Sequence, residues 1–325
     1  MQLYRAETPG PMKDSKLTPR ITETAKALWY IYLALTVVCG LAYWLAGMSV
    51  FDAIAHSFST VAIGGFSTHD ASIGYFNNPA IELIAIIFML ISGVNFALHF
   101  TVWRSRNPLV YWRDSEFKSY LSMILLAALI VIGYLFFSTN TAFLDAVRQG
   151  AFQTVSIATT TGFATANFSV WPAFLPILLL FLSFAGGCAG STGGGMKVIR
   201  VLLLFKQGSR ELKRLIHPNA QFVVKLGTQP TSDAVIESVW VFFSAYVLVF
   251  VILMLLVMGS GLDQVTAFSA VAASLNNLGP GLGQVTANYA GIGDFTKWVL
   301  CFAMIMGRLE IFTFLVLLTP VFWRR

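Results

Sequence analysis

The sequence predicts an all-α polytopic membrane protein built from three repeated units. Three observations predict this fold class. The 325 residues are 57% hydrophobic and 11% charged, with a mean hydropathy of +0.73, whereas soluble domains carry about 25% charged residues. Six apolar stretches have the roughly 20-residue length that a spanning helix needs. Short, moderately apolar segments also recur between these stretches in the same order, and such internal repetition determines the architecture.

The six predicted spans cover residues 27–47, 80–101, 119–138, 173–205, 236–259 and 296–322. They pair into three units, 27–103, 119–205 and 236–325, separated by basic loops at 104–118 and 206–235. Residues 1–26 are polar and lack an apolar h-region, so we expect a connector there and no cleavable signal peptide.

The net charge of +6 is concentrated at one side of the predicted topology. Apart from Arg148, Lys297 and Arg308, every Lys and Arg lies in 5–26, 104–118, 197–225 or 324–325. The positive-inside rule then places both termini and both basic loops in the cytoplasm. This distribution explains the net positive charge, so no nucleic-acid partner is needed to account for it. Cys39, Cys188 and Cys301 have no Cys-x-x-Cys spacing, so disulfides and zinc are not expected.

The gaps on the other side contain the repeated segments, at 51–68, 144–165 and 262–283. Each begins with an Asp at a position suited to a helix N-cap, namely Asp52, Asp145 and Asp263. A short apolar helix and a Thr-, Ser- or Asn-rich stretch follow, ending in glycine at 65, 162 and 279. These segments are too short to span, so we expect re-entrant helices followed by glycine strands.

Such strands favour ion conduction on physical grounds. Non-helical backbone at membrane depth is tolerated only where protein buries it or where it lines a water-filled cavity. Carbonyl oxygens around an axis can replace the hydration shell of a cation, and glycine allows close approach to that axis. The alternative is a packed re-entrant loop, which three copies in register make less favourable. No Ser/His/Asp or metal-binding constellation is visible, so no enzyme activity is expected.

At these positions the chain resembles the Trk/Ktr/HKT superfamily of potassium transporters. The motifs that carry the resemblance are Ser59–Thr68, Ala158–Thr165, Asn276–Gly283, the glycine-rich 183–198 and Gly307–Glu310. The resemblance implies span–pore-helix–span repeats, with six transmembrane helices and three re-entrant pore helices in this chain. It also implies K⁺ binding at the filter strands, whose residues are Ile63, Gly64, Gly65, Thr160, Thr161, Gly162, Asn277, Leu278 and Gly279.

The superfamily folds four such repeats around one pore, whereas this sequence contains three. The units match the second, third and fourth family repeats, and residues 1–26 resemble a connector between repeats. We therefore expect a first repeat to be absent. Two hypotheses follow: K⁺ uptake through a glycine filter, or a non-conducting fragment or assembly partner of a longer transporter.

The stretch "SFAGGCAGSTGGGMKV", residues 183–198, interrupts the predicted span 173–205. As one helix this span would be about 50 Å long, against a hydrocarbon core of about 30 Å, so we expect it to break at 185–196. A phosphate-binding loop would require Gly-Lys-Ser/Thr after a strand, which is not present. Two interpretations remain: a small-residue surface for helix packing, and a flexible loop. The resemblance implies the second, with the loop acting as a gate. Its residues are Gly186, Gly187, Gly190, Ser191, Thr192, Gly193, Gly194 and Gly195.

Four charged residues follow the glycine stretch or lie in the last span. Lys197 and Arg200 either couple the gate to a cytosolic partner or anchor the chain at the membrane surface. Arg308 and Glu310 lie inside the predicted span 296–322, where charge usually faces a cavity or a partner. Residues two apart on a helix do not face each other, so we expect different neighbours for the two. The resemblance implies pore charges that hold the gate, and the alternative is a buried salt bridge between repeats.

The resemblance also implies partners. They are the membrane lipid, a second copy in a homodimer in the bacterial inner membrane, and a cytosolic nucleotide-binding regulatory ring of the RCK type (TrkA) on the basic face. No cofactor is expected on the chain itself, and a nucleotide would act only through that ring.

Overall fold

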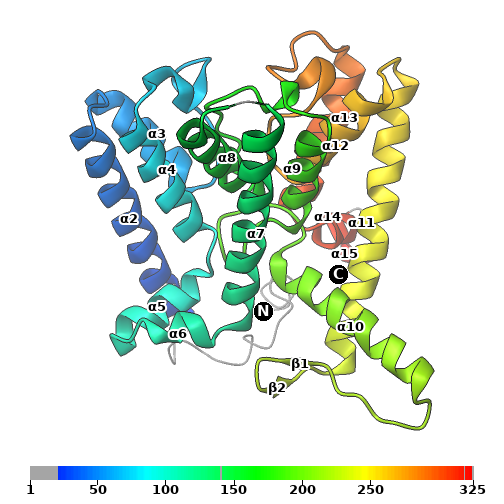
Figure 1. Cartoon of the computed structure of the whole chain (residues 1–325). Helices are drawn as coiled ribbons and strands as arrows, with labels where there is room; N and C mark the ends of the chain where they lie inside the picture. Colours follow the sequence, from blue (N-terminus) through cyan, green and yellow to red (C-terminus); the bar gives the residue numbers. More distant parts are fainter. Residues whose placement is uncertain (1–20, 140, 318, 324–325) are drawn as a thin grey trace.

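A computed structural model describes residues 21–139, 141–317 and 319–323, and this part of the chain is predominantly helical (Figure 1). Most of the expected connector, residues 1–20, lies outside the described residues. Residues 21–26, assigned to the same connector from the sequence, form the start of a helix.

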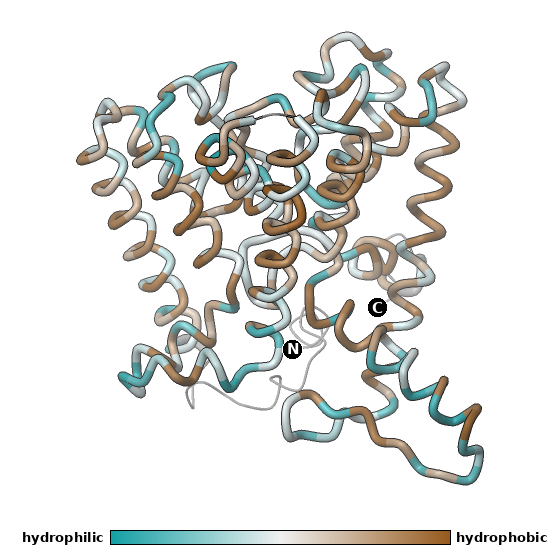
Figure 2. Tube along the Cα trace, viewed as in Figure 1, coloured by the Kyte–Doolittle hydropathy of each residue, from teal (hydrophilic) through white to brown (hydrophobic). Residues whose placement is uncertain are grey.

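Three long helices are each the first element of a unit: α2 (Ile21–Leu45), α7 (Ser115–Ser138) and α11 (Asp233–Gly259). Their most apolar windows are only 17%, 28% and 22% buried inside the protein. Leu45, Phe137 and Leu248 are largely exposed, and Figure 2 shows apolar residues along these helices. Apolar side chains on an outward face are typical of helices that face lipid.

A short helix follows each long one: α3 (Val50–Val61), α8 (Phe143–Ala158) and α12 (Gln264–Leu275). These helices bury small and hydroxyl residues and lie together near one end of the molecule (Figure 1). Asp263 caps α12 as predicted, its carboxylate accepting the Thr266 N–H. The N-cap prediction is wrong for Asp52 and Asp145, which lie in the first turn. Ser49 caps α3 instead, because its hydroxyl can accept the Asp52 N–H.

The third element of every unit is broken. The expected span 80–101 is two helices, α4 (Pro79–Ser92) and α5 (Phe96–Ser105), which meet at 92°. The expected span 296–322 is α13 (Asp294–Arg308), α14 (Phe312–Leu317) and α15 (Pro320–Trp323). Only the predicted break between α9 (Phe174–Ala185) and α10 (Val198–Ile216) had a clear glycine signal.

The structure therefore differs from six continuous spans. Within the described residues, three helices are long and apolar enough to cross a membrane, or four if α4 and α5 are one bent span. The bend between α4 and α5 forms because Asn95 caps α5, its side-chain oxygen accepting the Ala97 N–H. In the last unit, Glu310 and Ile311 have positive φ angles, which end α13.

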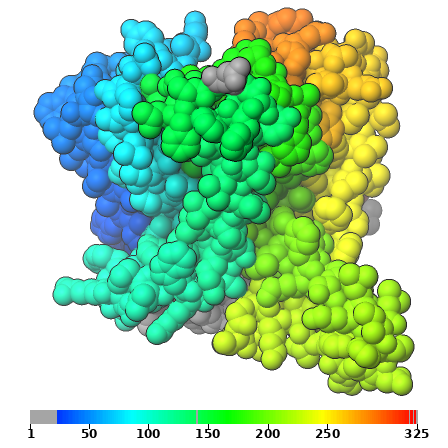
Figure 3. All heavy atoms as spheres, viewed as in Figure 1, coloured from blue at the N-terminus to red at the C-terminus, as the bar shows by residue number. Residues whose placement is uncertain are grey.

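The basic segments contain short elements. α6 (Leu109–Arg113) lies in 104–118, and α10 extends through 206–216. An antiparallel hairpin of β1 (Lys225–Leu226) and β2 (Gln229–Pro230) follows α10. Figure 3 shows this part projecting from the body of the protein. The short 3₁₀ helices η2 (Ser72–Phe76), η3 (Phe168–Val170) and η4 (Gly283–Val285) lie near the opposite end.

Two large buried clusters connect neighbouring units. One joins residues of α2, α3, α4 and α8, including Tyr43, Met89 and Phe152. The other joins α7, α9, α11, α12 and α13, including Leu179 and Val257. Because both clusters include residues of the middle unit, they hold the short helices of all three units in fixed relative positions.

Candidate functional site

The three short helices end in the same backbone geometry. Their C-cap residues, Ala62, Thr159 and Asn276, are all in the right-handed helical region. The next residues have positive φ, at 54° for Ile63, 66° for Thr160 and 56° for Asn277. Two residues further on, φ is positive again, at 69° for Gly65, 85° for Gly162 and 100° for Gly279. The repeated sequence pattern thus corresponds to a repeated conformation.

Equivalent hydrogen bonds hold the middle residue of each segment. Gly64 donates its N–H to the Ser59 carbonyl (2.7 Å), Thr161 donates to Ser156 (2.8 Å) and Leu278 donates to Ala273 (2.8 Å). Within the described chain, the carbonyls of these three residues accept no hydrogen bond from protein. Unpaired carbonyls near the protein interior need another partner, such as water or a cation.

The three segments lie side by side in chain order. A Cβ added to Gly65 would overlap the Thr161 carbonyl oxygen, and one added to Gly162 would overlap the Leu278 carbonyl oxygen. Glycine is therefore required at both positions by close backbone approach as well as by positive φ. Gly279 is exposed and has no such neighbour within 4 Å in the described structure.

The glycine-rich loop between α9 and α10 passes beneath these segments. Thr192 donates its hydroxyl to the Val61 carbonyl at the end of α3 (2.8 Å). Gly194 donates its N–H to the Thr160 hydroxyl (2.7 Å). A Cβ on Gly194 would also overlap the Asn276 carbonyl oxygen. The loop thus lies against the inner ends of all three short helices.

The loop keeps its shape through left-handed glycines and contacts with the bend of the first unit. Gly186, Gly190 and Gly195 have positive φ, which other residues rarely adopt. The Gly190 carbonyl accepts the Phe96 N–H (3.1 Å). The break in α9–α10 and the break in α4–α5 therefore satisfy each other's backbone groups, as irregular backbone at membrane depth requires.

Arg308 and Glu310 contact different neighbours, but helix spacing is not the reason, because α13 ends at Arg308 and Glu310 has a positive φ angle beyond it. Arg308 is exposed and donates a hydrogen bond to the Thr192 carbonyl in the loop (3.3 Å). Glu310 forms an ion pair with Arg200 (2.5 Å). For Glu310, the structure therefore contains the salt bridge between units that was the alternative to a pore charge.

Lys197 and Arg200 both point inward. Lys197 donates its ammonium group to the Gly193 carbonyl in the loop. Arg200 is 4% exposed, and its guanidinium also lies 4.0 Å from the centre of the Phe242 ring. Arg200 is therefore buried beside the loop in this conformation and is not a surface anchor.

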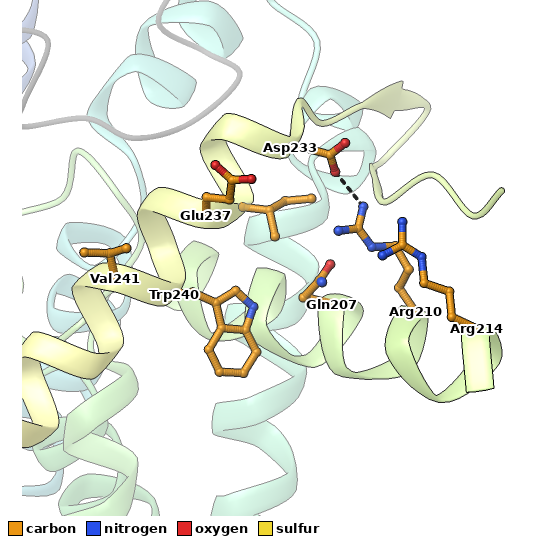
Figure 4. A pocket seen from close by; sticks show the side chains of 8 residues that line it. Gln207, Arg210, Arg214, Asp233, Glu237, Trp240 and Val241 are labelled. Carbon is orange, nitrogen blue, oxygen red and sulfur yellow. Dashed lines mark hydrogen bonds and ion pairs between the residues drawn. The ribbon is translucent and has the colours of Figure 1, made fainter. Parts of the chain in front are cut away.

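A polar cavity of about 470 Å³ lies away from the filter segments, between α10 and the start of α11 (Figure 4). Arg210 and Arg214 face Asp233 and Glu237 across it, and Arg210 pairs with Asp233 (2.7 Å). Its basic and acidic side chains balance in charge, and it does not reach the glycine segments. We therefore do not assign it to the candidate site.

Glu116 is a site residue that the sequence did not reveal. It lies in the first turn of α7, is 7% exposed, and accepts hydrogen bonds from the glycine loop and from α10. An acidic residue in the first turn of a helix is common, so the sequence provided no signal that separates this role from the ordinary one.

The fold and the site define a class: a polytopic helical membrane protein in which buried short helices direct glycine segments toward one another. The family TrkH, described as a cation transport protein, matches residues 1–324. The chain belongs to this family, and the resemblance to potassium transporters found in the sequence is confirmed. The family is one of transporters and not of enzymes.

Individual relatives of the chain support the same family assignment. The chain is 60% identical to the "Trk system potassium uptake protein TrkH" of Vibrio parahaemolyticus, covering 100% of this chain and 67% of the relative. It is 56% identical to the protein of that name in Escherichia coli K12, with the same coverage. The crystal structure of the potassium transporter TrkH from V. parahaemolyticus matches with a TM-score of 0.90 at 59% identity, covering 94% of this chain and 66% of that one. The chain thus spans about two thirds of the length of these relatives.

Proposed function

We propose that this chain forms part of a pathway for potassium uptake across the bacterial inner membrane. The observation that carries the proposal is the arrangement of three glycine segments with unpaired carbonyls, each built in the same way and placed side by side. The names of the relatives, which are potassium uptake proteins, supply the ion. The proposed architecture is three span–pore-helix–span repeats.

In this proposal K⁺ binds at the filter segments 63–65, 160–162 and 277–279. Their carbonyl oxygens replace the hydration shell of the ion, and the α3, α8 and α12 helices direct their partial negative ends toward it. The positive φ angles recur at the same alternate positions in all three segments, which supports one shared direction for their carbonyls.

The glycine-rich loop 185–196 is the proposed gate. It lies beneath the filter and touches the inner ends of all three pore helices, so it blocks the ion path in this conformation. Arg308 adds a positive charge beside the loop and binds Thr192. This charge opposes a cation below the filter and stabilises the blocked position.

The proposed orientation has the basic segments and both termini in the cytoplasm, by the positive-inside rule. The projecting α10, the hairpin and α6 then form the cytoplasmic face. We propose this face as the site for an RCK-type regulatory ring (TrkA) that carries the nucleotide, and a homodimer as the assembly. Arg200 is buried, so in this proposal it affects the regulatory ring only by holding α10 in position. Lys206 and Lys213 on the same helix lie outside the core.

The test is ⁸⁶Rb⁺ uptake and growth at low K⁺ in cells without potassium uptake systems of their own. Two proteins are compared at equal membrane abundance: this chain, and the same chain preceded by one more span–pore-helix–span unit. Uptake by either protein supports the proposed pathway. Uptake by the longer protein alone would place the function in that longer protein and favour the alternative of a non-conducting fragment for this chain. If neither transports Rb⁺ although both reach the membrane, the proposed function is wrong.

A further inference from the structure

Glu116 is a buried carboxylate that touches the glycine loop at two places. Its Oε1 accepts the backbone N–H of Ala189 (2.7 Å) and the backbone N–H of Ile199 (3.2 Å). Ala189 lies within the loop, and Ile199 lies in the first turn of α10, just after the loop. One oxygen atom from α7 therefore holds both the loop, at Ala189, and the start of the helix that follows it, at Ile199.

The start of α10 has no cap of its own. Lys197 occupies the N-cap position with a φ of 78°, and its side chain makes no capping hydrogen bond. The first N–H groups of a helix have no partner within the helix. Val198 donates to the Gly187 carbonyl (3.0 Å), and Ile199 donates to Glu116. Glu116 thus replaces the missing cap with a side chain from another helix.

This arrangement makes the observed loop position favourable. Hydrogen bonds from backbone N–H groups to a carboxylate are stronger than those to neutral acceptors. Within the described residues Glu116 forms no salt bridge, and its hydrogen-bond partners are the N–H groups of Ala189 in the loop and Ile199 in α10. If the loop moved away, the buried Glu116 carboxyl oxygen would lose both of its hydrogen-bond partners, and an unpaired buried acceptor is costly.

We propose that Glu116 is a positioning residue that holds the glycine loop beneath the filter and so sets the balance between the blocked and open states. The proposal rests on the proposed function of the loop as a gate. Thr192 of the loop binds the end of α3, and Arg308 of α13 binds Thr192. Glu116 holds the loop from α7, the outer helix of the same unit.

The test uses the transporting form of the protein with Glu116→Gln and Glu116→Met. Glutamine keeps the shape and an acceptor oxygen but lacks the charge, and we expect Rb⁺ uptake per molecule to rise about fivefold. Methionine has no acceptor, so the rise should be larger. Glu116→Asp keeps the charge and should lie closer to the parent protein. Glu237→Gln, on an exposed position of α11 far from the loop, is the matched control.

A second readout follows the loop itself without transport. Cys188 precedes Ala189 and is 1% exposed, so its reaction with a small thiol reagent reports loop displacement. Cys39 and Cys301 are first replaced by serine. We expect Cys188 to react faster in Glu116→Gln and faster again in Glu116→Met, with no change in Glu237→Gln.

The outcomes separate the two proposals. Faster uptake together with faster Cys188 labelling supports the role of Glu116. Unchanged labelling, or lower uptake that follows a lower melting temperature, overturns it, because a residue needed only for folding would give that result. Faster labelling in a protein that never transports Rb⁺ would support the anchor while contradicting the proposed function.

Discussion

Three residues other than glycine have left-handed backbone at equivalent places in the filter segments. Ile63, Thr160 and Asn277 all have φ between 54° and 66°. For a β-branched residue such as Ile63 this conformation costs free energy, of the order of 1–3 kcal/mol. The surrounding hydrogen bonds must compensate for it, and the cost recurs where function is proposed. A conformation repeated in spite of its cost indicates that the direction of the carbonyls matters.

The clearest prediction for a single residue concerns Gly162. We expect Gly162→Ala to reduce Rb⁺ uptake at least tenfold, because the added Cβ would overlap the Leu278 carbonyl oxygen and φ is 85°. The measurement is uptake at matched membrane abundance. Gly133→Ala in α7, where nothing lies within 4 Å of the new Cβ, should leave uptake unchanged. Equal uptake by both variants would show that the close approach of these segments has no role in transport.

Helices are broken at corresponding places in all three units, and each break is satisfied differently. The α4–α5 bend uses Asn95 as a cap and donates Phe96 N–H to the loop. The α9–α10 break uses twelve residues rich in glycine, 186–197. α13 ends at Arg308, just before Glu310 and Ile311, which have positive φ angles. The breaks bring irregular backbone to one level, where the three units share hydrogen bonds. The loop between α9 and α10 is held by these hydrogen bonds and by the buried side chains of Cys188 and Met196, and our proposal that it acts as a gate requires these contacts to break.

A test of that element is Thr192→Val. Valine has nearly the same shape but cannot donate to the Val61 and Ser92 carbonyls, which accept from Thr192 at 2.8 and 3.3 Å. Losing these bonds destabilises the blocked position by about 1 kcal/mol, so Rb⁺ uptake should rise severalfold. Thr101→Val, which removes a hydroxyl bonded within α5, is the control. Unchanged or lower uptake in Thr192→Val would argue against the loop as a gate.

Ion pairs join neighbouring units across the whole molecule. Arg148 of α8 pairs with Glu82 of α4 (2.5 Å), and Arg200 of α10 pairs with Glu310 after α13 (2.5 Å). The middle unit is therefore tied to the first by one pair and to the last by the other. Buried pairs add little net stability compared with apolar residues, but removing one partner is costly.

This predicts a specific pattern for Arg200 and Glu310. Arg200→Met should leave Glu310 unpaired and lower the free energy of unfolding by about 2 kcal/mol, below the value for a fully buried pair since Glu310 retains 21% exposure. Glu310→Gln should have a similar effect. The double variant should be less destabilised than the sum of the two, as thermal unfolding in detergent or nanodiscs would show. Additive losses would mean that the two side chains do not stabilise each other.

The sequence by itself determined the class of protein, the family and the repeated glycine segments. These follow from local patterns: the length of the apolar stretches, the positions of Lys and Arg, and the spacing of Asp, Thr and Gly. Each of these patterns can be recognised within a short segment of the chain. It also indicated the break at 185–196, since consecutive glycines disfavour a helix.

Only the tertiary structure decided which residues meet. The breaks after Ser92 and Arg308 lie in strongly apolar stretches, and the loop and α10 provide the partners that make them possible. Arg200 and Glu116 have the sequence signals of an ordinary surface charge and an ordinary first-turn acid, yet both are buried. Their roles depend on groups about 70 to 110 positions away in the chain, and such contacts leave no periodic pattern in the sequence.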